Sequence, residues 1–299
     1  MIAFQPGILA DVPPFSRYLT FSLIPGAFPA PVLQRFAKIV DGDALVIGVG
    51  VSLVSAMGET IPDLKTFPVF AQAGHDVPST PAMLWCWLRG TDMGDLVHLT
   101  HRVCDELAEA FECDSMLDAF KHGTGRDLTG YEDGTENPEG QDAIDVAFVS
   151  GAVPGLDGSS FVAVQTWLHD LPYFGAMTGK EQDNIIGRRK SDNEELDDAP
   201  ESAHVKRTAQ EDFTPEAFLL RRSMPWANAS GEGLQFVAFN QGFDAFETLL
   251  KHMLGLDDGI CDALFKFTKP IAGAYFWCPP MQAGGGGLDL RALGIKPEA

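Results

Sequence analysis

The chain has 299 residues, of which 45% are hydrophobic, so it can bury a substantial core in one large domain or two fused ones. Its 42 acidic and 21 basic residues give a formal net charge of -21 at pH 7. A field of that sign repels phosphate backbones and anionic membranes, which argues against nucleic acid and membrane partners.

Cysteine use and the N-terminal sequence both favour a cytoplasmic protein. The five cysteines are scattered, none forms a CxxC pair, and the odd count argues against a disulfide framework or a structural zinc site. Residues 1–19 contain no basic segment followed by an apolar core, and no apolar run of membrane-spanning length occurs. We therefore expect a non-exported protein in a reducing compartment.

In the first half of the chain, apolar and aromatic runs predict three strands and two helices. Residues 16–23, 44–51 and 82–88 have the pattern of strands, and residues 30–40 suit a short helix. A long helix is expected over about residues 93–112. Its apolar residues recur at helical spacing: Leu96, Leu99, Val103, Leu107 and Phe111.

A similar order of strands and helices recurs in the second half of the chain. Strands are expected at residues 160–167, 218–223 and 234–239, and the last leads into a helix over about residues 243–254. This strand and helix echo the pair at residues 82–112, which is a weak internal repeat in a βαββαβ-like order. Two ferredoxin-like halves whose sheets pack or join would make one α+β unit.

The domain organisation follows from this repeat. We expect an N-terminal half at residues 1–128, a connecting segment at 129–158, a C-terminal half at 159–280 and a flexible glycine-rich tail at 281–299. A frayed end is the simplest interpretation of the tail, and a docking peptide for a partner is the alternative. Residues 171–203 look like a long polar loop, which in a compact domain is usually functional or disordered.

A glycine-bracketed turn lies at residues 130–138. Gly130 and Gly134 flank Asp133, and Asn137-Pro138 closes the run, so the sequence predicts a sharp, ordered turn that can hold a carboxylate rigidly. Judged alone, a solvated surface bend is the simpler interpretation.

One histidine and two arginines are further candidates for functional residues. His204 follows an acidic run and precedes a segment that looks strand-like, although a lone histidine is more often structural than a ligand. Arg221 and Arg222 are adjacent on a predicted strand, so only one can point inward, and it would need an anionic partner. The simpler alternative leaves both at a strand edge in water. No phosphate loop, Ser-His-Asp motif or HExxH is present.

Six short motifs, in order, resemble those of the dye-decolourising peroxidases, haem enzymes of the dimeric α+β barrel superfamily. The resemblance covers about residues 4–279, and the compact length without an export signal looks most like the B-type group. It implies two ferredoxin-like repeats in a dimeric α+β barrel-type fold with antiparallel sheets and peripheral helices. The motifs are Gln5-Pro6-Gly7-Ile8-Leu9, Gly130-x-x-Asp133-Gly134-Thr135-x-Asn137-Pro138, Ile186-Gly187-Arg188, Ser202-Ala203-His204-Val205, Leu220-Arg221-x-Ser223-Met224-Pro225 and Phe267-Thr268-x-Pro270-x-x-Gly273.

The resemblance implies one haem b per chain, with His204 as the proximal iron ligand. A ligating imidazole needs an acceptor for its other ring nitrogen, and Asp262 matches the family's proximal carboxylate. The alternative for Asp262 is an ordinary helix N-terminal residue. Arg188 matches a haem propionate contact, for which a guanidinium is apt. Phe236 would pack over the haem, although ordinary core packing fits it equally well.

On the distal face the resemblance places Asp133 and Arg221. Asp133 would shuttle the peroxide proton, and Arg221, which is always cationic, would stabilise the developing anion. Gly134 and Thr135 of the same turn would contact the cofactor. Ser223 stands where many B-type members have asparagine, and this shorter side chain departs from the family's pattern.

The implied activity is the reduction of hydrogen peroxide through an oxo-ferryl intermediate, coupled to oxidation of dyes, phenolics or similar small aromatic reductants. An aspartate has a reference pKa of about 3.9 against about 6.5 for histidine, so an aspartate base predicts an acidic pH optimum. One alternative is a haem-binding or iron-handling protein with incidental peroxidase activity, and another is a ferredoxin-like oligomer without a cofactor.

The implied partners are further copies of the chain, in a homo-oligomer, and an encapsulating shell protein that would bind the C-terminal tail. Bulky donors cannot enter a small distal pocket, so a surface tyrosine or tryptophan would relay electrons. Packing is the simpler interpretation of each candidate relay. These candidates are Trp226, Trp167, Tyr131 and Trp277.

Overall fold

The computed structural model describes residues 4–70, 74–284 and 286–296, and its strands fall into two groups along the chain. The first group is β1 (Phe15–Leu23), β2 (Leu45–Val49), β3 (Leu84–Gly90) and β4 (Phe111–Phe120). The second is β5 (Ser160–His169), β6 (Leu220–Arg221), β7 (Met224–Asn228), β8 (Gly231–Asn240) and β9 (Thr268–Cys278).

Within the described residues these strands form one antiparallel sheet in the order β4-β1-β3-β2-β9-β5-β8-β6, and β7 follows β6 along the same edge of β8. Each half therefore repeats the strand order fourth, first, third, second, which confirms the two ferredoxin-like repeats. The halves join where Val49 of β2 pairs with Trp277 of β9. β4 and β7 lie side by side, which curls the sheet toward a barrel.

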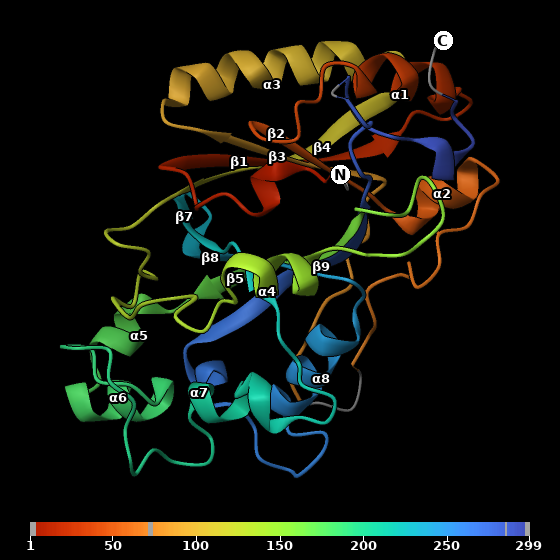
Figure 1. The fold of residues 1–299 in the computed structure, drawn as a ribbon. Helices are drawn as coiled ribbons and strands as arrows, with labels where there is room; N and C mark the ends of the chain where they lie inside the picture. The colour runs from red at the N-terminus through yellow and green to blue at the C-terminus, as the bar shows by residue number, and fades with distance from the viewer. Residues whose placement is uncertain (1–3, 71–73, 285, 297–299) are drawn as a thin grey trace.

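Helices cover the outer faces of the sheet (Figure 1). α1 and α3 lie over the strands of the first half, and α7 and α8 lie on the side of the second half. None of the helices in the described ranges is long and apolar enough to cross a membrane. The helices are α1 (Pro29–Ala37), α2 (Val51–Ala56), α3 (Met93–Leu107), α4 (Gly140–Ala147), α5 (Leu171–Gly175), α6 (Gly179–Ile186), α7 (His204–Arg207) and α8 (Asp244–Met253), with short 3-10 turns η1 (Pro6–Ile8), η2 (Gln210–Asp212), η3 (Ala263–Lys266) and η4 (Arg291–Leu293).

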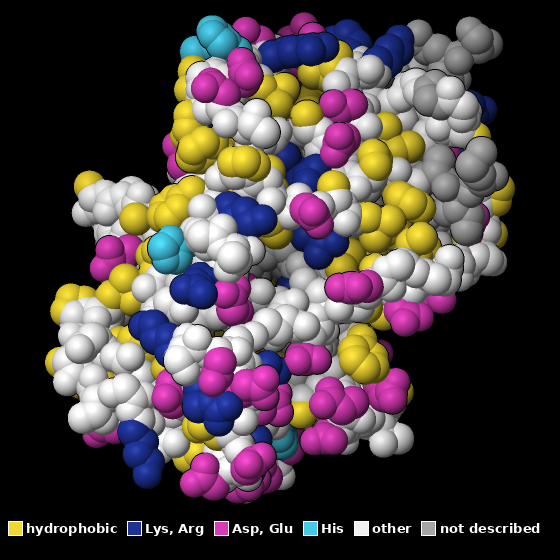
Figure 2. Space-filling view, turned by 60° about the vertical axis from the view of Figure 1, so that its left-hand side comes forward, with side chains coloured by type: hydrophobic (Ala, Val, Ile, Leu, Met, Phe, Trp, Pro, Cys, Tyr) yellow, Lys and Arg dark blue, Asp and Glu magenta, His cyan; other side chains and the backbone are white. Residues whose placement is uncertain are grey.

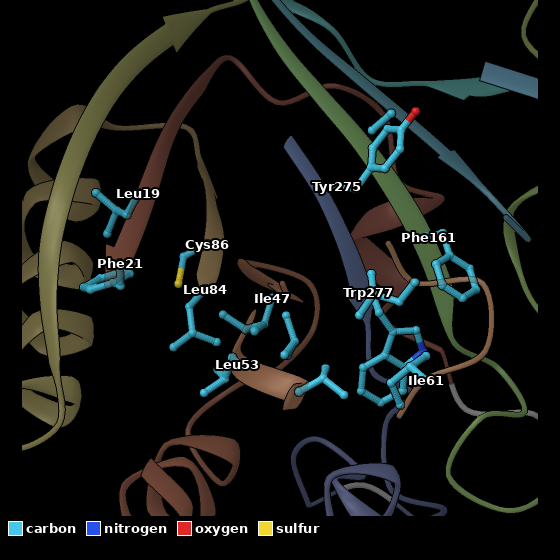
Figure 3. Close-up of a cluster of buried hydrophobic side chains, with 14 of the residues drawn as sticks. Leu19, Phe21, Ile47, Leu53, Ile61, Leu84, Cys86, Phe161, Tyr275 and Trp277 are labelled. Atoms are coloured by element: carbon cyan, nitrogen blue, oxygen red, sulfur yellow. The ribbon is translucent and has the colours of Figure 1, made fainter. Parts of the chain in front are cut away.

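Strand alternation divides the core into two clusters. On β3, Trp85 and Trp87 face the inside of the curled sheet, where their rings lie against Phe239 of β8. Leu84 and Cys86, which alternate with these tryptophans, face outward and join the second cluster, which packs beneath the helices (Figure 3). Because successive side chains of a strand point to opposite faces, a strand buried on both faces loses the simple alternation of apolar and polar residues.

Three sequence expectations about local structure are wrong. The long helix expected to residue 112 ends at Leu107, and the chain then forms β4, an edge strand with mostly exposed side chains that carries little apolar signal. The polar loop expected at residues 171–203 contains α5 and α6, each with a side-chain N-cap. The strand-like segment expected at His204 is the short helix α7.

The C-terminal tail is not the free peptide expected from its glycines. Leu288, Leu290, Leu293 and Ile295 are all buried and belong to the outer core cluster. The Leu288 N–H donates to the Ala37 carbonyl at 3.1 Å, which fixes the tail against the end of α1. Residues 285 and 297–299 of the predicted tail lie outside the described residues. Residues 288–295 of the tail are therefore part of the fold.

This packing predicts a measurable cost for truncating a tail side chain. Leu293 is 1% exposed, so Leu293→Ala should lower the free energy of unfolding by about 2–5 kcal/mol through lost burial and a residual cavity. Leu256 is 39% exposed, and Leu256→Ala should change it by less than about 0.5 kcal/mol. Urea unfolding of the two variants measures the difference, and equal effects would contradict a docked tail.

Candidate active site

A cavity of about 1020 Å³, including its opening to solvent, lies between the second-half sheet and the helices α7 and α8. Alternate residues of β5 and β8, among them Gln165, Trp167 and Phe236, form one wall. Apolar residues of α8 form another, including Phe246, Leu249, Leu250 and Met253. A largely apolar cavity of this size with a few polar groups is typical of a cofactor or ligand site.

His204 enters this cavity from the first residue of α7. Its Nδ1 lies 2.7 Å from Oδ2 of Asp262, whose side chain is fully buried. Because a carboxylate is an acceptor, Nδ1 carries the proton in the neutral ring, and Nε2 keeps a lone pair for a ligand. Asp262 also caps η3, since its Oδ1 accepts from the Leu264 N–H at 2.8 Å. Asp262 is thus both the helix N-terminal residue and the histidine's partner.

A glycine fixes the position of α7. Gly187 ends α6 with φ 95°, and a Cβ there would lie 2.3 Å from a methyl carbon of Val205. A larger residue would strain the backbone and push α7, and with it His204, away from its place. Within the described residues no group of three or more His, Cys, Asp or Glu side chains could hold a metal ion.

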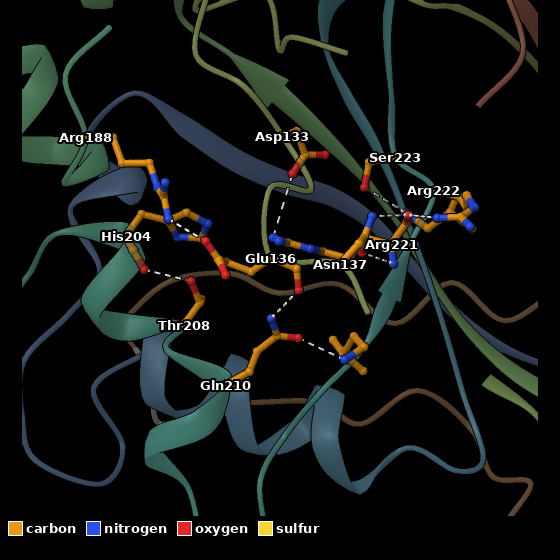
Figure 4. A network of polar contacts seen from close by, with 12 residues as sticks. Asp133, Glu136, Asn137, Arg188, His204, Thr208, Gln210, Arg221, Arg222 and Ser223 are labelled. Atoms are coloured by element: carbon orange, nitrogen blue, oxygen red, sulfur yellow. Dashed lines mark hydrogen bonds and ion pairs between the residues drawn. The ribbon is translucent and has the colours of Figure 1, made fainter. Parts of the chain in front are cut away.

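The turn at residues 130–138 brings Asp133 to the same cavity. Asn137 ties the turn to β6, because its Oδ1 accepts from the Arg221 N–H at 2.8 Å and its Nδ2 donates to the Arg221 carbonyl at 3.0 Å. Figure 4 shows Asp133 and the end of the Arg221 side chain pointing toward each other, with Oδ1 and Nη1 3.7 Å apart. That separation is an ion pair rather than a hydrogen bond.

The two neighbouring arginines face opposite ways, as expected for a strand. Arg221 lines the cavity, and its buried Nε has no hydrogen-bond partner. Arg222 points to the other side, where it donates to the carbonyls of Ile8, Leu9 and Arg221. Burial lowers the pKa of Arg222 to about 10, which leaves it cationic at neutral pH. The alternative that both arginines lie in water at a strand edge is wrong.

Sequence reasoning missed a buried pair, Asp127 and His169, in the cavity wall. The Nε2 atom of His169 lies 3.0 Å from Oδ2 of Asp127, and its Nδ1 lies 2.6 Å from the Thr268 hydroxyl, which itself donates to the Leu168 carbonyl. Both ring nitrogens of His169 therefore have a hydrogen-bond partner in the wall. Strand alternation from Gln165 to His169 was the signal that could have placed this histidine in the wall.

Asp127 holds the start of the functional turn. Its Oδ1 accepts hydrogen bonds from the backbone N–H and hydroxyl of Thr129. Burial acts to raise the pKa of Asp127, but the hydrogen bonds and charge of His169 and the contacts with Thr129 outweigh it, so the pKa lies below its ordinary value. The pair of Asp127 and His169 anchors the segment that carries Asp133 to the ends of β5 and β9.

The structure brings four of the predicted site residues into the cavity wall: His204, Asp133, Arg221 and Phe236. Gly134 and Ser223 instead line an adjoining polar cleft of about 840 Å³, which shares Asp133 and Arg221 with the cavity. The Ser223 hydroxyl lies 3.5 Å from the Val237 N–H of β8.

Two predicted residues are placed elsewhere. Thr135 is exposed, because the turn directs Asp133 and Asn137 inward and this residue outward. Arg188 binds Glu136 at 2.8 Å and Glu195 at 2.5 Å, and neither Arg188 nor Thr135 is among the described residues that line the cavity. A cofactor contact for either residue stays a prediction.

Comparisons with known proteins agree on one family. The model described as "Dyp-type peroxidase, C-terminal" matches residues 124–283, which include every predicted site residue. The chain is similar to a dye-decolorizing peroxidase of Rhodococcus erythropolis, 31% identical over 83% of this chain and 76% of the relative. It is also similar to a DypB variant of Rhodococcus jostii in complex with heme, with TM-score 0.83, 25% identity, and 91% and 95% of the two chains covered. An encapsulated DyP-type peroxidase from Mycobacterium smegmatis shares the fold, with TM-score 0.84, 24% identity, and 94% and 96% covered.

The Asp127–His169 pair predicts a pH-dependent stability. Because the folded pKa of Asp127 is lowered, its carboxylate stabilises the fold above the unfolded value of about 3.9, and this contribution is lost as pH falls through the folded pKa. Asp127→Asn should cost about 3 kcal/mol at pH 7, because it breaks a buried pair, and the cost should shrink in acid. Urea unfolding at a series of pH values measures it. The exposed Asp142→Asn is the control, and a cost for Asp127→Asn that does not change with pH would contradict the ion pair.

Proposed function

Because this chain belongs to the Dyp-type peroxidase family, it is a peroxidase with haem as its cofactor, and we propose that His204 ligates the haem iron while Asp133 and Arg221 activate hydrogen peroxide. The observation that carries this proposal is that two pairs meet in one cavity. A histidine is paired with a buried carboxylate, and an aspartate is paired with an arginine. The electron donors would be dyes, phenolics or similar small aromatic molecules.

The residues of the cavity fit a haem. Its walls are largely apolar, as a flat macrocycle requires, and Nε2 of His204 is free to bind a metal. The buried Nε of Arg221 and Nε2 of Gln165 have no hydrogen-bond partner, although both residues line the cavity. Such buried unpaired donors are costly, so they favour a polar ligand at this place. When bound, haem supplies an iron at which peroxide can be reduced.

On the proximal side, Asp262 sets the properties of His204. The 2.7 Å contact with Nδ1 fixes the tautomer and ring orientation, and it makes Nε2 a stronger electron donor. The Leu264 N–H holds the other carboxylate oxygen, so the carboxylate cannot rotate away without losing a helix cap.

On the distal side, Asp133 and Arg221 would have different roles. Asp133 would accept a proton from one peroxide oxygen and return it to the oxygen that leaves as water. Arg221 would stabilise the negative charge that develops as the O–O bond breaks. Asn137 positions both groups, because it binds the backbone of β6 from within the turn.

A haem-binding or iron-handling role remains the competing proposal. It requires only His204 and an apolar cavity, whereas the ion pair of Asp133 with a partly unsatisfied Arg221 has no purpose in storage. The distal pair therefore favours catalysis. A contact from Arg188 to a haem propionate would require this residue to exchange a glutamate that it now binds.

The proposed setting is the cytoplasm, in agreement with cysteines that are all unpaired in the structure. Homo-oligomers and a shell partner for the tail are further proposals, the latter suggested by the encapsulated neighbour. In this chain, however, a shell could bind residues 288–295 only after Leu288, Leu290, Leu293 and Ile295 had left the core. That release would cost several times the roughly 2 kcal/mol of burying one leucine.

The absorption spectrum tests the cofactor and its ligand. The purified chain loaded with haem should show an intense Soret band, and His204→Gly should lose or shift it because the iron loses its protein ligand. Added imidazole should restore the band, since the ligand would fill the vacated space. His98→Ala, an exposed change on α3, should leave the spectrum unchanged. A His204→Gly protein with the wild-type spectrum would refute this ligand.

The peroxide step tests the distal aspartate. In rapid mixing with one equivalent of hydrogen peroxide, Asp133→Asn should slow the reaction by about 10²- to 10⁴-fold, because the proton acceptor is lost. The wild-type activity on reducing donors should peak below pH 7, since an aspartate remains a usable base in mild acid. Asp142→Asn, at an exposed position, should match the wild type in both assays. An optimum near pH 8 would count against Asp133.

A further inference from the structure

The N-terminal motif at residues 5–9 contributes no side chain to the cavity, because every described residue that lines the cavity lies at or beyond Asp127 in the sequence. The motif is nevertheless held firmly. The amide of Gln5 binds both the N–H and the carbonyl of Ile47 in β2, and its Nε2 also donates to the Pro279 carbonyl at 3.0 Å. These contacts fix the start of the chain at the junction of the two halves.

Gly7 lets this segment lie directly against the first half of the sheet. A Cβ at Gly7 would lie 2.7 Å from the Asp43 carbonyl oxygen and 2.8 Å from a methyl carbon of Val46. The Gly7 N–H donates to the Gly42 carbonyl at 2.8 Å, and Ile8 is buried in the core cluster inside the curled sheet. The segment is therefore held by close packing as well as by hydrogen bonds.

The last carbonyls of this segment bind a buried arginine of the second half. Ile8 and Leu9 lie at the end of η1, where carbonyl groups lack partners within the turn. Arg222 donates to them from Nε at 3.1 Å and from Nη2 at 2.8 Å. Its Nη1 donates to the Arg221 carbonyl at 3.0 Å. One guanidinium thus joins the start of the chain to the backbone of Arg221.

The backbone of Arg221 needs such support because β6 is short. This strand has two residues and pairs with β8 along one side. On the other side, Asn137 and Arg222 both donate to the Arg221 carbonyl. The Arg221 guanidinium lies 3.7 Å from Asp133, and a displacement of about 1 Å at a catalytic group can slow a reaction by up to about 100-fold. Loss of one support should therefore be measurable in the peroxide step.

The alternative role for Arg222 is to add positive charge, since it lines the polar cleft that adjoins the cavity. Lys121 and Arg126 line the same cleft, and Figure 2 shows Lys and Arg side chains gathered around a hollow in the middle of one face. Figure 4 shows the Arg221 and Arg222 side chains extending in opposite directions. All three hydrogen bonds of Arg222 go to backbone carbonyls, which a rigid guanidinium fork can hold together. This geometry favours positioning over charge.

We propose that Arg222 is a positioning residue for peroxide reduction, and that it holds Arg221 in place against the N-terminal segment of residues 5–9. The inference rests on the proposed function, because the position of Arg221 matters only if this residue acts on peroxide. The first half of the chain then sets the position of a group in a cavity to which it contributes no described residue. The N-terminal motif also gains a role in the site.

Hydrogen exchange tests the contact in the chain without haem. In Arg222→Gln, the amides of residues 218–226 should exchange at least about fivefold faster than in the wild type, because β6 loses a support. Gln5→Ala should have the same effect, although Gln5 does not line the cavity, because it loosens the segment from its other end. The amides of α3 should exchange at the wild-type rate in both variants, which shows that the fold is intact.

The peroxide step separates position from charge. In the haem-loaded enzyme, Arg222→Gln and Arg222→Lys should both slow the reaction with one equivalent of hydrogen peroxide by about tenfold. Lysine keeps the charge but has a single nitrogen, which cannot hold three carbonyls as the fork does. Arg126→Gln is the matched control, because it removes a charge from the same cleft and Arg126 pairs with Glu132 rather than with Arg221. Its rate should stay within about twofold of the wild type.

Fluoride binding reports the position of Arg221 without turnover. Fluoride bound at haem iron accepts a hydrogen bond from a cation that is correctly placed beside it. Its Kd should rise about three- to tenfold in Arg222→Gln and Arg222→Lys, and it should keep the wild-type value in Arg126→Gln.

The outcomes separate this inference from the proposed function. If the wild type does not react with peroxide, the proposed function fails, whereas hydrogen exchange still decides whether the contact holds β6. If the wild type reacts but Arg222→Lys keeps the wild-type rate and fluoride Kd, Arg222 acts through its charge and the positioning role is wrong. Unchanged exchange at residues 218–226 in Arg222→Gln also overturns it. If Arg222→Gln does not fold, Gln5→Ala decides the question by the same three measurements.

Discussion

The Asp262 carboxylate is the contact on which the site depends. One oxygen caps η3 and the other holds the imidazole of His204, so a single buried group fixes both the segment before β9 and the helix α7. The side chain has no exposed surface, and a buried carboxylate is costly unless its oxygens are satisfied. The same hydrogen bonds that make burial tolerable leave Nε2 of the histidine directed to the cavity. Structural and chemical roles are therefore inseparable at this residue.

The rest of the cavity wall contains two further pairs in which an acidic side chain lies beside a basic one. Asp133 faces Arg221, and Asp127 faces His169, each pair bridging the turn to the sheet. Every charge in an apolar wall needs a partner, since isolated ions would carry a large desolvation penalty. The closer pair, Asp127 with His169, is suited to anchoring, whereas the looser 3.7 Å pair leaves Arg221 with an unused donor. This difference separates groups that hold the turn from groups that can act on a ligand.

The sequence predicted the strands and helices that have strong periodicity, and it missed those that do not. β1, β3, β5 and α8 lie within a few residues of their expected places. β9 was missed because Pro270 and Gly273 interrupt its apolar pattern, and β4 because its exposed edge carries Glu112 and Asp114. Local pattern contains no information on which charges meet. The link from Asp127 to His169 spans 42 residues, and only the folded sheet brings them together.

The identities of His204, Asp133 and Arg221 came from motif spacing, but their partners came from three-dimensional packing. From the sequence, Asn137 could be interpreted only as a turn residue, although its side chain binds both the N–H and the carbonyl of Arg221. The sequence also did not predict the glutamates that bind Arg188, since Glu136 lies 52 residues from it along the chain.

The packed tail also has a consequence for how the protein is made. Leu288 and Leu293 complete the apolar layer beneath α1, and Gln5 near the start donates its side-chain amide to the Pro279 carbonyl near the end. The first half therefore completes its packing only after residues 288–295 have been synthesised. Until then, the apolar layer beneath α1 lacks the side chains that cover it, so a chain that has not yet reached residue 288 exposes apolar surface there.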